Sequence, residues 1–149
     1  MALAASSRAE DIHTHCGGVL VNKDWRVLNT AYNGYKAGMK IPERFLLEEN
    51  RKEKGEHIVH CEQNLLSHYT GEAYAIGLTI SPCERCCDAI VAHGIQEVYY
   101  IEEYHRDVEK KFKKKLDFYG IKYQQMNRDN IINILNYMDE DANKLRRLV

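Results

Sequence analysis

The chain has 149 residues, of which 44% are apolar and 29% are charged, and its formal net charge is -1. This composition excludes a disordered or collagen-like polymer, and the length suits one globular domain over residues 1–149. The near-neutral charge argues against stable nucleic-acid binding, because duplex binding requires several uncompensated Lys or Arg residues. A small charged substrate is the partner that this composition leaves open.

The longest nearly apolar stretch, residues 73–80, is far shorter than the ~20 residues that a membrane-spanning helix needs. The first ten residues reach acidic side chains after a few small apolar ones, unlike a secretory signal. We therefore expect no membrane partner and a cytoplasmic location. In that reducing compartment, the five Cys residues are expected to be metal ligands, reactive thiols or core residues rather than disulfides.

The first half of the chain predicts a β-hairpin, a polar excursion and a short helix. Residues 16–34 contain two β-rich runs separated by a polar turn, which is typical of a hairpin. The glycine-punctuated segment 35–56 is expected to be a functional excursion over one sheet edge, with a short helix after Pro42. From His60, apolar residues recur at helical spacing until Gly71 ends the pattern.

The second half alternates strands and helices. Residues 73–80 predict a buried strand, and the following Ser-Pro-Cys-Glu predicts a helix that begins at Cys83, has Ser81 as its N-cap and ends at Gly94. This alternation predicts an α/β fold with a largely parallel sheet and helices on its faces. The remaining predicted elements are a strand at 97–101, an amphipathic helix from Val108 to Tyr119, a strand at 121–126 and a C-terminal helix from Ile131 to Leu145.

Two clusters of residues indicate a metal site: His60 with Glu62, and Cys83 with Cys86 after Pro82. Cysteines three apart in the first turn of a helix can bind one metal ion, and the positive helix end favours their thiolates. With His60 as the third ligand, the fourth tetrahedral position of Zn²⁺ stays open for water, as in catalytic sites. Glu62 would then be the catalytic proton shuttle rather than a ligand. The combined pattern is typical of zinc-dependent deaminases of cytosine and adenine.

On these residues the sequence resembles the cytidine deaminase superfamily and, more closely, the deoxycytidylate deaminases within it. The likeness covers most of the chain. The family usually has Ala where Cys61 stands. We expect both Cys61 and Cys87 to be packed in the core. The segments that carry the resemblance are residues 30–34 (Thr-Ala-Tyr-Asn-Gly), 60–64 (His-Cys-Glu-Gln-Asn), 81–86 (Ser-Pro-Cys-Glu-Arg-Cys) and 94–98 (Gly-Ile-Gln-Glu-Val), followed by Tyr104 and His105.

The resemblance implies a three-layer α/β/α sandwich with a mixed five-stranded sheet, one catalytic Zn²⁺ per chain and hydrolysis of dCMP to dUMP and ammonia. Zinc-bound hydroxide would attack C4 of cytosine while Glu62 moves a proton. The resemblance also implies a homohexamer and, in regulated members, the effectors dCTP and dTTP with Mg²⁺. Lys36 departs from the family's usual Pro in the segment that forms the effector site of those members.

Several residues are candidate substrate contacts. By resemblance, Asn33 would bind the 3′-hydroxyl of the sugar, Tyr104 would cover the base or gate entry, and Asn64 belongs to the zinc-helix motif. A 5′-phosphate requires cationic or amide donors. The candidate donors for it are Lys36, Arg44, His105 and Arg106.

Alternative functions remain open on the sequence alone. A nucleoside or free-base deaminase would use the same zinc chemistry without a phosphate-binding loop. An editing deaminase that acts on tRNA or single-stranded DNA is disfavoured by the net charge, and a noncatalytic zinc module would not need Glu62. A second, structural metal site is a minority hypothesis, for which the ligands would be His13, His15, Cys16 and His57.

Overall fold

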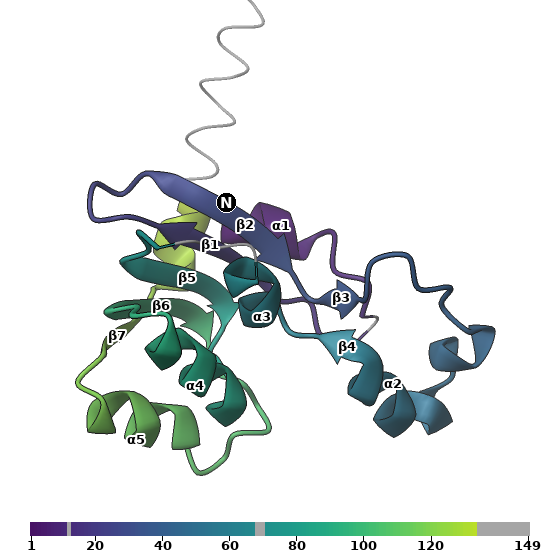
Figure 1. The fold of residues 1–149 in the computed structure, drawn as a ribbon. Coiled ribbons are helices and arrows are strands. Elements are labelled where there is room, and N and C mark those ends of the chain that lie inside the picture. Colours follow the sequence, from purple (N-terminus) through teal and green to yellow (C-terminus); the bar gives the residue numbers. More distant parts are fainter. Residues whose placement is uncertain (12, 68–70, 134–149) are drawn as a thin grey trace, which may run out of the picture.

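The main sheet of the computed structural model, which describes residues 1–11, 13–67 and 71–133, has five strands in the order β2-β1-β5-β6-β7 (Figure 1). β1 pairs antiparallel with β2 and with the central strand β5, whereas β5, β6 and β7 are parallel. The sheet is therefore mixed, as the resemblance implied, and less parallel than the alternation of elements predicted. Its strands are β1 (Gly17–Val21), β2 (Val27–Tyr32), β5 (Ala75–Ile80), β6 (Glu97–Glu102) and β7 (Lys122–Gln125).

Helices cover both faces of this sheet (Figure 1). Two adjacent glycines of β1 mark the two faces, because successive strand residues point to opposite sides. A Cβ atom on Gly17 would overlap the backbone of α1 (Ala2–Ser6), and one on Gly18 would contact side chains of α3 (Cys61–Leu66). α1 therefore lies on one face of the sheet and α3 on the other. Because α4 (Glu84–Ala92) packs beside α3, it covers the same face as α3, and the arrangement is an α/β/α sandwich.

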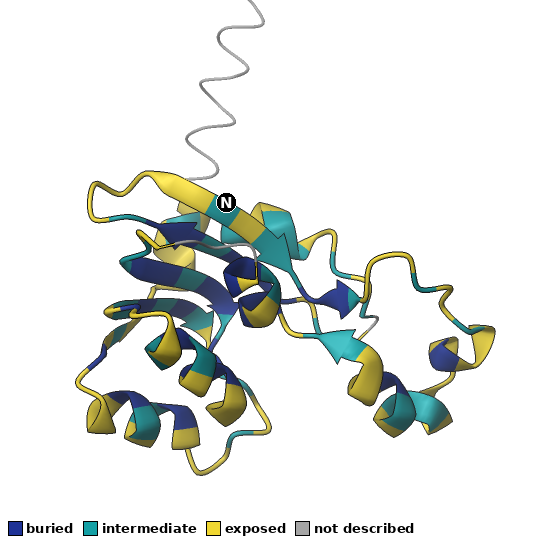
Figure 2. Ribbon diagram, viewed as in Figure 1, coloured by how far each residue is buried: buried dark blue, intermediate teal, exposed yellow. Residues whose placement is uncertain are grey.

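The hydrophobic core lies between the sheet and α3, α4 and α5 (Lys111–Phe118), where Figure 2 shows the inner faces buried. Burial of each such apolar side chain contributes about 1.5–3 kcal/mol. Tyr100 and Phe112 meet edge to face with ring centroids 5.4 Å apart, which fixes α5 against β6. Members of this core that are fully buried include Leu20, Leu65, Ile76, Val98 and Leu116.

A lobe formed by residues 36–57 projects from the five-stranded sheet (Figure 1). It is the excursion that the sequence predicts, and a two-stranded antiparallel sheet closes its base. Phe45 is the buried apolar residue of the lobe and stacks on His57 at 5.5 Å between ring centroids. The elements of this region are β3 (Gly34–Tyr35), the 3₁₀ turns η1 (Glu43–Leu46) and η2 (Glu48–Asn50), α2 (Arg51–His57) and β4 (Ile58–Val59).

The start of α4 differs from the prediction. Cys83 is the N-cap and the helix begins at Glu84, so Ser81 is not the capping residue. The reason is a competing contact: the Ser81 hydroxyl accepts a hydrogen bond from the Tyr104 backbone N–H at 2.9 Å. Ser81 therefore fastens the loop after β6 to the end of β5 instead of capping α4.

The start of α5 also differs, because the helix begins at Lys111 and leaves Val108 84% exposed. The Asp107 carboxylate accepts hydrogen bonds from the backbone N–H groups of Lys111 and Phe112, at 2.9 and 3.1 Å. This side chain fixes the helix start three residues beyond Val108. The C-terminal helix predicted from Ile131 begins earlier, at residue 128, and is helical up to residue 133; its remaining positions, from 134 onward, lie outside the described residues.

No helix in the described part of the chain combines the length and the apolar character that crossing a membrane requires. The α-helices that lie wholly within the described residues, α1 to α5, have between five and nine residues.

Gly17→Ala is expected to lower the free energy of unfolding by about 1–3 kcal/mol. The added methyl group would overlap backbone atoms of Ala2 and Ser6, which no side-chain rotation can relieve. Urea denaturation would measure the change. Gly55→Ala is the control, because a Cβ atom there contacts nothing inside α2 and should stabilise by about 0.5–1 kcal/mol. Equal midpoints for the two variants would contradict the close contact between α1 and β1.

Candidate metal centre and cavity

Three potential metal ligands converge where α3 and α4 begin. His60 is the N-cap of α3, Cys83 is the N-cap of α4, and Cys86 lies in the first turn of α4. His60 Nδ1 lies 3.5 Å from Cys83 Sγ and 3.4 Å from Cys86 Sγ. Within residues 1–11, 13–67 and 71–133, these are the side chains that could together hold a metal ion, with ligand atoms within 4.8 Å of one another.

These separations fit a tetrahedral zinc ion. Typical Zn–S and Zn–N bonds place a sulfur and a nitrogen ligand about 3.6 Å apart in tetrahedral geometry. One imidazole and two thiolates are ligands that Zn²⁺ prefers, and three protein ligands leave a fourth position for water or substrate. The residues present therefore fit zinc, and the structure brings together the three ligands that the sequence spacing predicted.

Local electrostatics favour a thiolate at this centre. The thiol of Cys86 and the imidazole of His60 hydrogen-bond to Cys83 and, against the effect of burial, lower its pKa to about 4. The Cys83 sulfur in turn raises the pKa of His60, and burial opposes that shift. A negative sulfur at the start of α4 also interacts favourably with the helix dipole. The site is therefore prepared for a cation.

Glu62 is the carboxylate beside the three ligands. It is the second residue of α3 and only 4% exposed, and burial raises its pKa to about 7. A carboxyl group whose pKa lies near neutral pH can both accept and donate a proton. The Glu62 position thus suits proton transfer at the metal centre.

A cavity of about 190 Å³ opens at the metal centre and extends to the lobe. It is lined by Asp11, His13, Thr14, Cys16, Asn33, Arg51, Lys54, Gly55, Ile58, His60, Cys61, Glu62, Ile80, Ser81, Cys83, Tyr104 and Arg106.

Two of the predicted substrate contacts, Asn33 and Tyr104, line this cavity, and so does Arg106. The Asn33 amide is already engaged: its Oδ1 accepts from the Cys16 backbone N–H, and its Nδ2 donates to the Thr14 carbonyl, both at 2.7 Å. Asn33 therefore shapes the loop that forms one cavity wall, and its Oδ1 retains a second lone pair.

The other predicted substrate contacts lie outside the cavity. Asn64 Nδ2 donates to the Tyr32 carbonyl at 2.9 Å, which attaches α3 to β2. Arg44 pairs with Glu53 on the lobe surface at 2.7 Å. Lys36 lines a different hollow, behind the metal ligands, and His105 packs edge to face against the Tyr104 ring.

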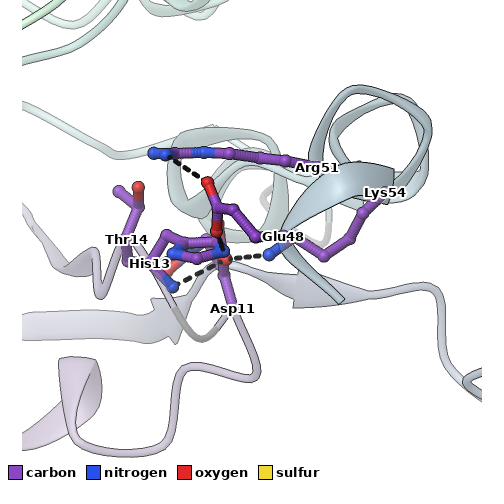
Figure 3. A network of polar contacts seen from close by, with 7 residues as sticks. Asp11, His13, Thr14, Glu48, Arg51 and Lys54 are labelled. Carbon is purple, nitrogen blue, oxygen red and sulfur yellow. Dashed lines mark hydrogen bonds and ion pairs between the residues drawn. The ribbon is translucent and has the colours of Figure 1, made fainter. Parts of the chain in front are cut away.

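Two cations and the loop that form the outer wall of the cavity were not predicted from the sequence to be parts of the site. Arg51 and Lys54 come from α2, and Figure 3 shows them next to Asp11, His13 and Thr14. The spacing of three residues between the two cations was the available signal, since it places both on one helix face. Their direction relative to the metal centre depends on the placement of the whole lobe, which no local pattern indicates.

Asp11 and Lys54 form a buried ion pair in this wall. Lys54 Nζ lies 2.9 Å from Asp11 Oδ1, and their side chains are 3% and 14% exposed. Burial alone would raise the pKa of Asp11, but hydrogen bonds from the His13 backbone N–H and from Lys54 hold that pKa below its ordinary value. The pair connects the segment before β1 to the lobe.

The residues considered for a second metal site do not come together in the described part of the chain. His13 Nε2 lies 2.7 Å from Glu48 Oε2, and the His57 ring stacks on Phe45. Cys61 and Cys87 are buried in the hydrophobic core, as expected.

Comparisons with known proteins agree with this geometry. The family model described as the cytidine and deoxycytidylate deaminase zinc-binding region matches residues 1–102. A probable deoxycytidylate deaminase of Caenorhabditis elegans is 27% identical over 130 residues, which cover 85% of this chain and 66% of the relative. The deoxycytidylate deaminase of Homo sapiens is 23% identical over 113 residues, 72% of this chain and 64% of the relative. The chain thus spans about two thirds of the length of these relatives.

Solved structures share the fold. The apo dCMP deaminase from the cyanophage S-TIM5 superposes with a TM-score of 0.67 at 21% identity, over 84% of this chain and 90% of that chain. The same cyanophage enzyme in complex with dCMP and dUMP gives a TM-score of 0.65 at 22% identity, with the same coverage.

Cys83→Ser and Cys86→Ser are each expected to lose most of the bound zinc, because a hydroxyl is a much weaker zinc ligand than a thiolate. Metal analysis of each purified variant after dialysis would give the zinc content per chain. Cys87→Ala is the matched control, since Cys87 lies next to Cys86 in α4 but is not one of the three ligands. Full zinc content in both serine variants would refute the ligand set.

Asp11→Asn is expected to cost about 1–3 kcal/mol of folding free energy at pH 7, because it leaves the Lys54 ammonium buried without its anion. The cost should shrink in acid. The folded-state pKa of Asp11 is lowered from 3.8, so its ionised form stabilises the fold above that pH and the contribution is lost as the pH falls through the lowered pKa.

Urea denaturation of wild type and variant between about pH 7 and pH 2.5 would measure this difference. Asp24→Asn, in the exposed hairpin turn, is the control and should show no such dependence. A stability difference for Asp11→Asn that does not change with pH would contradict the role given to its charge.

Proposed function

Because the chain belongs to the cytidine and deoxycytidylate deaminase family, whose zinc-binding region matches residues 1–102, we propose that it hydrolyses dCMP to dUMP and ammonia. The observation that carries this proposal is that Glu62 lines one cavity with His60 and Cys83, two members of the candidate ligand set completed by Cys86. A structural zinc site would not require a buried carboxyl group beside an open metal position. The relatives named as deoxycytidylate deaminases support the choice of substrate.

Each part of the centre has a distinct task in this reaction. Zinc held by His60, Cys83 and Cys86 would lower the pKa of water at its open position, so that the water can attack C4 of cytosine at neutral pH. Glu62 would accept a proton from the attacking water and donate it to N3 of the ring. It would then accept the proton of the hydroxyl group at C4 and pass it to the exocyclic amine, which leaves as ammonia while a carbonyl forms at C4.

The cavity walls would hold the base and exclude water. Asn33 fixes the loop of residues 14–16 through its two short hydrogen bonds, and its remaining Oδ1 lone pair can accept from the sugar 3′-hydroxyl. The backbone N–H of Tyr104 is anchored to Ser81, which keeps the tyrosine at the cavity. We propose that its ring covers the base.

Further features follow from family resemblance and are part of the proposal. They are a homohexameric assembly, a cytoplasmic location, and regulation by dCTP and dTTP with Mg²⁺. Lys36, at the position where the family usually has Pro, lines the hollow behind the metal ligands together with Arg85 and Cys86. Mass photometry, and dCMP assays with each effector present, test the assembly and the regulation separately.

Glu62→Gln is expected to retain zinc and to lose about 10²–10⁴-fold in kcat for dCMP, because an amide cannot transfer the proton. The assay would offer zinc-loaded protein dCMP, CMP, deoxycytidine, cytidine and a cytosine-containing single strand, with product analysis by chromatography. Glu84→Gln removes an exposed carboxylate next to Cys83 and should keep wild-type turnover. Near-wild-type turnover in Glu62→Gln would exclude the proposed proton transfer, and no turnover of dCMP by wild type would refute the function.

A further inference from the structure

Two cations of the lobe face the cavity that contains the metal centre. Arg51 and Lys54 are one turn apart in α2 (Figure 3), and both line the same cavity as His60 and Glu62. The acids that line the cavity are Asp11 and Glu62, against the cations Arg51, Lys54 and Arg106. A ligand whose base lies at the metal centre would therefore meet positive charge on the side of the lobe.

Lys54 has hydrogen-bonding capacity that the described residues do not use. Its side chain is 3% exposed, and its ammonium group donates to Asp11 Oδ1 at 2.9 Å. The same oxygen also accepts from the His13 backbone N–H at 3.0 Å. An ammonium group carries three donors, and no second acceptor for Lys54 is present among the described side chains and backbone groups. Buried charged donors without acceptors are costly, so an anionic oxygen entering the cavity would be stabilised there.

Arg51 forms an exposed ion pair with Glu48, a partner that a phosphate group could replace. Its guanidinium contacts Glu48 Oε1 at 3.1 Å, with side chains 37% and 64% exposed. Such exposed pairs contribute about 0–1 kcal/mol, and a guanidinium binds phosphate through two parallel hydrogen bonds. Glu48 also contacts His13 Nε2 at 2.7 Å, so it retains a partner when Arg51 turns toward the cavity.

We propose that Arg51 and Lys54 form the subsite that binds the phosphate of a nucleoside 5′-monophosphate, and that this subsite makes the protein select nucleotides over nucleosides. The inference rests on the proposed function, which places the base at the metal centre. It replaces Arg44 and Lys36 as the phosphate contacts, since neither of these lines the cavity. The buried Lys54 ammonium group is held in place by Asp11, whereas the exposed Arg51 side chain can change its orientation to bind the phosphate.

Titration calorimetry of zinc-loaded protein with dUMP and with deoxyuridine tests this proposal, because the two probes differ only in the phosphate. Wild type should bind dUMP more tightly. Arg51→Gln and Lys54→Met should each weaken dUMP binding on the order of 10- to 100-fold and leave deoxyuridine binding nearly unchanged. Lys52→Met is the matched control, because Lys52 is exposed in the same helix and does not line the cavity.

Lys54→Met leaves the Asp11 carboxylate without its partner, so the double variant Asp11→Asn with Lys54→Met is measured as well. It removes both charges of the pair and should keep the fold, as circular dichroism would show, while it loses the preference for dUMP. If this folded double variant binds dUMP as wild type does, the subsite is wrong.

Other results overturn the assignment equally clearly. They are equal binding of dUMP and deoxyuridine by wild type, no binding of dUMP, losses no larger than in Lys52→Met, or a loss confined to Arg106→Gln. Failure of the proposed function is separate. If wild type releases no ammonia from dCMP but binds dUMP through Arg51 and Lys54, the subsite stands and the deamination does not.

Discussion

The candidate site depends on one close contact, the approach of α3 to Gly18 of β1. A Cβ atom at Gly18 would meet the side chains of Leu65 and Cys61, so the absence of a side chain lets α3 lie directly on the strand. The short separation between α3 and β1 sets the position of His60, the N-cap of α3, and of Glu62, its second residue. Since α4 starts at the end of β5, the neighbour of β1, its first turn brings Cys83 and Cys86 within reach of His60. Sheet packing therefore fixes the ligand geometry.

Burial at the same place sets the chemistry. Removing Glu62 from water raises its pKa to about 7, and a negative sulfur at Cys83 acts in the same direction, while a cationic His60 opposes it. A carboxylate in water would be ionised at neutral pH and would make a poor proton donor. The desolvation that raises the pKa of Glu62 also destabilises its charged form. Residues at catalytic positions commonly lower the free energy of unfolding in this way.

The sequence predicted the metal ligands better than the cavity around them. His60, Cys83 and Cys86 follow from spacing within two helix starts, which is local information. The predicted starts of α4 and α5 were wrong. Ser81 accepts a hydrogen bond from Tyr104 instead of capping α4, and Asp107 accepts one from Lys111, where α5 begins. The strands after the hairpin, β5 to β7, are parallel as the alternation predicted, but the whole sheet is mixed because β1 of the hairpin pairs antiparallel with β5, a pairing that element order does not indicate.

The outer cavity wall illustrates why distant contacts resist prediction. Arg44 and Arg51 lie on the same lobe, yet of the two only Arg51 lines the cavity. The difference arises from the pairing of β3 with β4 and from the Asp11–Lys54 ion pair, which together orient α2 toward the segment before β1. Most of the lobe is exposed or only partly buried (Figure 2), and the ion pairs His13–Glu48 and Asp11–Lys54 connect it to the segment before β1.

The two ion pairs of α2, Asp11–Lys54 and Glu48–Arg51, would respond differently to a bound ligand. The Lys54 pair is buried and persistent, whereas the Arg51 pair is exposed and exchangeable. An anion in the cavity would thus add contacts to Lys54 without breaking its bond to Asp11, and would replace only the weaker partner of Arg51. Because a ligand that binds only the folded state stabilises that state, the orientation of α2 and the binding of an anion are thermodynamically linked.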